Sequence, residues 1–156
     1  DPFRIQYYGT YSIEKLTKTV YDWYHKEGYT VFENVYKHKK GGEGYDIEMK
    51  LKAHKKINEH LRYDIGYEIK SRDSEPAEII ENGQKIKGYK GRATIVIDFA
   101  LETDWQKTLT KLPIKLKKVL YSYFMKLHIE DDADIIYYKA VDLQKTIKST
   151  LGMSTT

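Results

Sequence analysis

Three runs of alternating apolar and polar residues limit what this chain can fold into more than any other feature. Apolar side chains take every second position in each run, with mostly polar residues between them. The runs comprise Tyr45, Ile47, Met49, Leu51 and Ala53; Leu61, Tyr63, Ile65, Tyr67 and Ile69; and Ala93, Ile95, Ile97, Phe99 and Leu101. Alternation with a period of two predicts strands with one buried and one wet face. Residues 29–38 are also rich in strand formers, so the sequence predicts four strands.

The dipeptide Asn82-Gly83 predicts how the third and fourth strands connect. Asn-Gly between strand-like flanks favours a two-residue type I′ turn, which pairs Glu81 with Gln84. Odd positions of one strand then oppose even positions of the other. Because the apolar residues are odd-numbered in both strands, an odd number of extra residues must interrupt one of them.

Pro76 indicates where that interruption lies. Proline cannot donate a hydrogen bond to a strand ladder, so we expect a bulge within residues 71–77. Beyond the bulge, the hairpin is expected to project from the body as a polar arm over about residues 72–92.

Helical spacing of apolar residues predicts three helices. Ser12 is a good N-cap and Gly28 a good C′ residue for a helix over 13–27. Pro113 suits the first turn of a second helix that continues to about residue 129. An acidic run from Glu130 begins the third helix, where negative charge complements the helix dipole.

The order of these elements is α-β-β-β-β-α-α, without the βαβ alternation of a parallel sheet. We therefore predict a single α+β domain of two layers over residues 1–156. A four-stranded antiparallel meander carries three helices on one face, and residues 153–156 are frayed.

Composition excludes several classes of chemistry. The chain has no cysteine, so it has no disulfide, thiolate metal site or cysteine nucleophile. A signal-peptide core and a long apolar segment are both missing from the sequence, so we expect a cytoplasmic protein without a transmembrane helix. Catalytic and phosphate-binding motifs are missing as well. The sequence thus favours a protein that is not an enzyme and that needs no cofactor.

The spacing of the histidines does not predict a metal site. His54 and His60 flank a strand bend, and Asp64 lies on the same wet face as His54, but no third ligand accompanies them. His128 precedes the acidic run, which is better explained as helix capping.

Residues 105–129 differ most from the rest of the chain in charge. They hold six lysines and no acidic residue, while the whole chain carries only +4. The spacing of these lysines predicts a basic stripe on an amphipathic helix. The stripe is either a solvated face, a contact for phosphates, or a membrane-surface face. The residues expected to meet a polyanion or another partner are Lys111, Lys115, Lys118 and Lys126, with Trp105 and Tyr121 for stacking.

The even-numbered face of the sheet is a second candidate surface for single-stranded nucleic acid. We place both Phe32 and Tyr36 of the first strand on it. Its basic residues are Lys50, Lys52, His54, Arg62, Lys70, Lys90 and Arg92. Acidic residues share this face, however, which favours solvated pairs of opposite charge.

Three functional hypotheses follow. The leading one is a binding or assembly module that docks on an anionic or protein partner, such as a nucleic acid or nucleoprotein, through the lysine stripe and the arm. The arm residues expected to take part are Asn82, Gly83, Lys85 and Lys87. A second is a small-molecule binder or enzyme with a pocket between the curved sheet and the C-terminal helices, lined by tyrosines such as Tyr63, Tyr67 and Tyr123. A third is a subunit of a homo-oligomer.

Overall fold

A computed structural model of the protein describes residues 2–42, 44–58, 61–103, 113–116, 118–119 and 130–153. The elements are β1 (Phe3–Tyr11), α1 (Ile13–Glu27), β2 (Thr30–Lys40), β3 (Tyr45–Asn58), β4 (Leu61–Glu81), β5 (Gln84–Thr103) and α4 (Glu130–Thr150).

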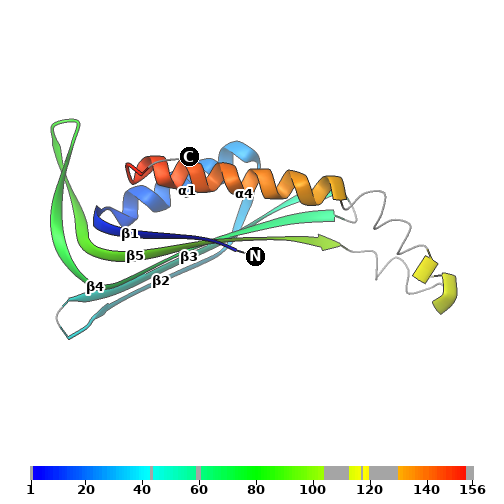
Figure 1. The fold of residues 1–156 in the computed structure, drawn as a ribbon, viewed down its shortest axis with the longest axis horizontal. Helices are drawn as coiled ribbons and strands as arrows, with labels where there is room; N and C mark the ends of the chain where they lie inside the picture. The colour runs from blue at the N-terminus through cyan, green and yellow to red at the C-terminus, as the bar shows by residue number, and fades with distance from the viewer. Residues whose placement is uncertain are drawn as a thin grey trace.

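The strands form a five-stranded antiparallel sheet in the order β1-β5-β4-β3-β2. Helices α1 and α4 lie on the same side of this sheet (Figure 1). The predicted α+β content and antiparallel sheet are confirmed. The predicted four-stranded meander with three helices on one face is wrong, because a further strand precedes α1. Of the predicted helix that ends near residue 129, only 113–116 and 118–119 are among the described residues.

The additional strand, β1, pairs with the most distant strand in sequence. Its register runs from Phe3 opposite Ile97 to Tyr11 opposite Tyr89. Ile5 and Tyr11 are buried, whereas Tyr8 is exposed. β1 therefore places its odd-numbered apolar residues in the core, as β3 and β5 do.

The two helices pack their apolar stripes on the odd-numbered face of the sheet. α1 begins at the predicted N-cap Ser12 and ends at Gly28, which has a positive φ of 82°. The α1 side chains Ile13, Leu16, Val20, Trp23 and Tyr24 and the α4 side chains Ile136, Ala140, Leu143 and Ile147 are buried.

Polar bonds fix the position of each helix. The Tyr24 hydroxyl donates to the carbonyl of Ile65 at 2.9 Å, which ties α1 to β4. The Trp23 indole donates to Asp142 of α4 at 2.9 Å. Because Tyr24 reaches the central strand, α1 crosses the β3–β4 part of the sheet.

The hairpin turn and the bulge are both confirmed. Glu81 pairs with Gln84, and both loop residues have positive φ, 51° at Asn82 and 77° at Gly83, as a type I′ turn requires. The pairing shifts by one residue between Arg72 and Glu75. The distal end of the β4–β5 hairpin turns out of the sheet toward the side of the helices (Figure 1). The expected arm over residues 72–92 and the single domain over 1–156 stay predictions.

We call the bend in β4 between Arg72 and Glu75 the corner. Asp73 is the extra residue there. Its φ is 50°, and its backbone N–H donates to a carboxylate oxygen of Asp46 at 3.0 Å. The pairing of β3 with β4 is interrupted at the same place, because its register shifts between Tyr45 and Ile47. The bulge therefore bends β4 against both of its neighbours.

A closed cluster of three hydroxyls fills the inside of the corner. Tyr11, Ser71 and Ser74 are buried and hydrogen-bond to one another, with 2.8 Å between the oxygens of Tyr11 and Ser74. All three hydroxyls thus have partners inside the core, which removes most of the cost of burying them. The neighbouring strands approach closely here: a Cβ at Gly91 would lie 2.7 Å from the Ser74 hydroxyl oxygen.

We expect Gly91→Ala to destabilise the protein by about 1–3 kcal/mol, because the added methyl overpacks the corner. Thermal or urea unfolding measures the change. Gly42→Ala is the matched control, since a Cβ at Gly42 meets no atom within 4 Å. Equal stability of the two variants would contradict the tight packing of the corner.

A second bulge reverses the faces of β2. Its pairing with β3 shifts between Val31 and Glu33, so Tyr36 pairs with the inward-facing Met49. Phe32 stays on the outer face, where it stacks on His54 with ring centroids 4.9 Å apart. The predicted place of Tyr36 beside Phe32 is therefore wrong, because one extra residue turns it to the helix side.

The assignment of faces gives a direct test. Ile65→Asp puts an unpaired charge at a position that is 1% exposed, and we expect a loss of at least about 4 kcal/mol. Glu68→Ala removes only its pair with Lys70 at the surface, so its expected effect is below about 1 kcal/mol. Chemical denaturation compares the two variants, and similar losses would contradict the orientation of β4.

Candidate ligand pocket beneath helix α1

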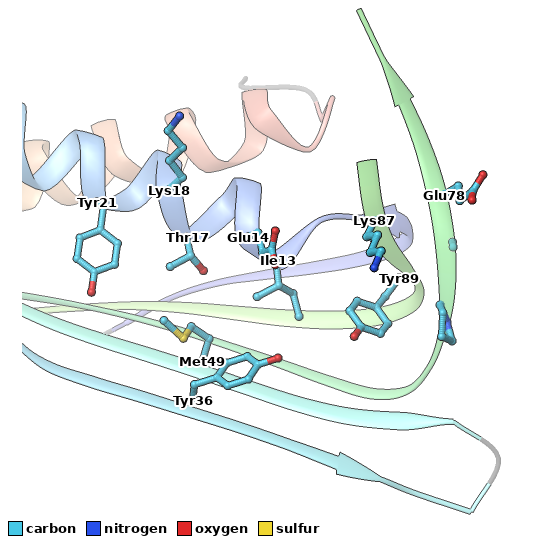
Figure 2. A pocket seen from close by; sticks show the side chains of 13 residues that line it. Ile13, Glu14, Thr17, Lys18, Tyr21, Tyr36, Met49, Glu78, Lys87 and Tyr89 are labelled. Carbon is cyan, nitrogen blue, oxygen red and sulfur yellow. The ribbon is translucent and has the colours of Figure 1, made fainter. Parts of the chain in front are cut away.

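A large hollow lies between the first half of α1, the sheet and the upturned hairpin (Figure 2). Its volume is about 1090 Å³, enough for a ligand of drug size. We call it the α1 pocket. It is lined by Ile13, Glu14, Thr17, Lys18 and Tyr21 of α1, Tyr36 of β2, Met49 of β3, Pro76, Ala77 and Glu78 of β4, and Lys87, Gly88 and Tyr89 of β5.

Helical geometry builds one wall of the pocket. Ile13, Thr17 and Tyr21 are spaced i, i+4 and i+8, so they form one stripe along α1. In Figure 2 their side chains point from the helix toward the sheet. The Tyr21 hydroxyl accepts a hydrogen bond from the Asn34 amide at 2.7 Å. This bond holds the Tyr21 ring between α1 and β2. The ring closes the end of the pocket that lies farthest from the hairpin.

The floor of the pocket consists of apolar and aromatic side chains. Met49 is buried, but the Tyr36 side chain beside it is 57% exposed. An exposed ring within a concave surface offers a large contact area to a ligand. This exposure follows from the bulge in β2, without which Tyr36 would face away from the helices.

The bent hairpin supplies the opposite wall. Pro76, Ala77, Gly88 and Tyr89 come from the two strands just beyond the bulge. The hairpin is attached to α1 by an ion pair between Lys15 and Glu81. The wall is therefore held from below by the corner and from above by the helix.

Tyr89 belongs to a group of rings beside the pocket. Its ring centroid lies 6.2 Å from that of His38 and 6.4 Å from that of Tyr45. Burial raises the pKa of the Tyr89 hydroxyl, and the neighbouring Tyr36, Tyr45 and Glu14 raise it further. This wall thus carries no tyrosinate charge at neutral pH.

The charges at the rim of the pocket cancel. Glu14 and Lys18 follow one another at i and i+4 on α1, and Glu78 lies opposite Lys87 in the hairpin. All four side chains belong to exposed residues. Two negative and two positive charges give the pocket no net electrostatic preference for an ion.

Two buried hydroxyls near the pocket stand out. Among the residues that the structure describes, the Thr17 Oγ1 and Tyr67 OH atoms make no hydrogen bond of normal geometry. Burial raises the pKa of the Tyr67 hydroxyl, and a loose hydrogen bond from the Thr17 side chain opposes this rise. Both groups therefore retain unused hydrogen-bonding capacity in the core, which costs folding free energy.

The predicted pocket tyrosines Tyr63 and Tyr67 do not line the α1 pocket. Tyr63 and Tyr67 are buried under the helices, where the Tyr63 hydroxyl donates to Asp132 at 2.6 Å. Tyr123 lies outside the described residues. The α1 pocket lies beneath α1, and the expected pocket against the C-terminal helices stays a prediction, because the first of those helices falls largely outside the described residues.

The lysine stripe can be followed only in part. Lys115 and Lys118 are exposed, while Lys111, Lys126, Trp105 and Tyr121 lie outside the described residues. In the arm, Asn82 and Gly83 form the turn, Lys85 pairs loosely with Glu78 at 3.8 Å, and Lys87 reaches the rim of the α1 pocket. Of the predicted stripe and arm residues that the structure describes, Lys87 alone lines the α1 pocket.

The outer face of the sheet carries charge pairs. Its acids and bases meet within and between strands, as mixed signs on a solvated sheet favour. The pairs are Glu33 with Lys52 at 3.5 Å, Arg62 with Asp64 at 2.8 Å and Glu68 with Lys70 at 3.1 Å.

Within the described ranges, no group of three or more histidine, aspartate or glutamate side chains is arranged to hold a metal ion. No helix in that part of the chain is long and apolar enough to cross a membrane. No protein-family model, curated protein or solved structure gives a significant match to the chain. The pocket must therefore be interpreted from its own chemistry.

The unpartnered hydroxyl of Thr17 gives a stability test. Thr17→Val replaces it with a methyl group of similar size, and valine and threonine have similar helix propensities. We expect the variant to match the parent or to exceed it by up to about 1.5 kcal/mol, because a buried hydroxyl disappears and no hydrogen bond of normal geometry is lost. The control is Thr19→Val, which loses a bond from its hydroxyl to the Lys15 carbonyl. A loss of stability in Thr17→Val, measured by thermal unfolding, would contradict the assignment.

Proposed function

We propose that the protein binds a small, uncharged and mainly apolar molecule in the α1 pocket. The observation that carries this proposal is a cavity of about 1090 Å³ whose interior is apolar and aromatic and whose charges lie at the rim. Ligand pockets commonly combine such a lining with few polar groups.

The balance of charge supports an uncharged ligand. Glu14 and Glu78 offset Lys18 and Lys87, so an anion and a cation each meet as much repulsion as attraction at the rim. Tyr36, Met49 and Ile13 offer the apolar contact inside. Binding would come from the removal of apolar surface from water.

A neutral fluorescent probe tests the proposal. 1-N-phenylnaphthylamine brightens in apolar surroundings, and we expect it to bind the full-length protein with saturation. Tyr36→Ala should weaken binding roughly 5- to 30-fold, because a ring contributes about 1–2 kcal/mol of contact.

Phe32→Ala is the matched control for Tyr36→Ala. Both side chains are exposed rings of β2, 51% and 57% respectively, but Phe32 lies on the outer face of the sheet. We expect its removal to leave binding unchanged. A protein that does not bind the probe, or equal losses in both variants, would refute a ligand site in the α1 pocket.

The interaction of the lysine stripe with nucleic acid and the formation of a homo-oligomer stay predictions. If lysines neutralise phosphates, log affinity should fall with log salt by roughly 0.7–0.9 per contact. Glutamine at Lys111, Lys115, Lys118 and Lys126 should then weaken binding to any sequence. Filter binding at low salt measures both effects.

A further inference from the structure

Thr17 departs from the behaviour of the other threonines in the described helices. The hydroxyls of Thr19, Thr146 and Thr150 each donate to the carbonyl four residues earlier, at 2.9, 2.9 and 3.0 Å. This bond is the ordinary way for a helical threonine to satisfy its hydroxyl. Thr17 lies in the same helix as Thr19 but does not make this bond to any described residue.

The Thr17 hydroxyl instead lies near that of Tyr67, on the central strand β4. Tyr67 is 1% exposed, and desolvation keeps its hydroxyl protonated by raising its pKa. Tyr67 can therefore both donate and accept a hydrogen bond at neutral pH. Two hydroxyls with free capacity thus lie together where α1 faces the sheet.

Thr17 also lines the α1 pocket, and in Figure 2 its side chain points from α1 toward the sheet between Ile13 and Tyr21. The Oγ1 atom itself is buried, so the contact with a ligand requires the side chains that cover Thr17 to shift when the ligand enters. One hydroxyl can donate once and accept twice. Thr17 can accordingly bond to a ligand and to Tyr67 at the same time.

We propose that Thr17 and Tyr67 form a polar subsite that recognises one hydroxyl or carbonyl group on a neutral aromatic ligand. This inference rests on the proposed function and adds the chemical class of the ligand: a ring compound of phenol type. The ring would lie over Tyr36 and Met49, and its oxygen would meet Thr17. The cancelling rim charges favour this neutral compound over an aromatic acid or amine.

Two probes that differ by one oxygen test the subsite: 2-naphthol and naphthalene. The measured quantity is the ratio of the two dissociation constants, naphthalene over 2-naphthol, by fluorescence titration of the full-length protein. Thr17→Val should lower this ratio about tenfold, because it removes the group that pairs with the naphthol oxygen. Tyr67→Phe should lower it as well, by a smaller factor, since Tyr67 acts through Thr17.

Naphthalene is the reference ligand within each variant, because it has no oxygen for Thr17 to meet, and the ratio therefore cancels any change in apolar contact. Thr19→Val is the control for a threonine that is already satisfied, and its ratio should equal that of the parent. A ratio that falls in Thr17→Val but not in Thr19→Val would support the subsite.

The failures of the two proposals are distinguishable. If both probes bind but the ratio is the same in the parent, Thr17→Val and Tyr67→Phe, the two hydroxyls are satisfied within the protein and the subsite is refuted, while the pocket stands. If neither probe binds the parent, the proposed function fails and the subsite fails with it.

Discussion

A single extra residue in β4 determines much of this architecture. Asp73 shifts the pairing of β4 with both neighbours, and the long hairpin bends at that point. Without the bend, β4 and β5 would continue in the plane of the sheet, and the α1 pocket would have no end wall. The bend persists because Tyr11, Ser71 and Ser74 satisfy one another inside it. The shape of the pocket is thus a consequence of strand register.

The same register explains what could be predicted from the sequence. The bulge follows from the turn at Asn82-Gly83 and from the odd numbering of the apolar residues, both of which are local patterns. α1 follows from Ser12, Gly28 and a helical stripe between them. These features could be predicted because each depends on neighbours within a few residues.

The features that were missed depend on distant partners. In β1 the paired tyrosines Tyr7 and Tyr8 and the following Gly9 blur the alternation, and the strand is defined by pairing with β5. The orientation of Tyr36 depends on a bulge in β2 that no proline or glycine marks. The pocket is harder still, because Thr17 belongs to α1 and Tyr89 to a hairpin wall that only tertiary structure brings near it.

The core contains buried hydroxyls in two states. At the corner, three hydroxyls form a closed set and serve the fold alone. Beneath α1, Thr17 and Tyr67 lie close together without completing such a set. Incompletely satisfied buried polar groups in natural proteins occur at functional or strained sites. The hydroxyls beneath α1 are therefore better candidates for ligand recognition than the closed set at the corner.

The pairing of β1 with β5 also determines when this protein can fold during synthesis. Phe3 is synthesised well before its partner Ile97, which belongs to the last strand among the described residues. Contacts of such long sequence separation form slowly, and an unpaired strand is exposed to association with other chains. The nascent chain therefore carries an open edge and the apolar face of α1 until β5 emerges. A ribosome that stalled before residue 97 would present a chain that cannot close its own sheet.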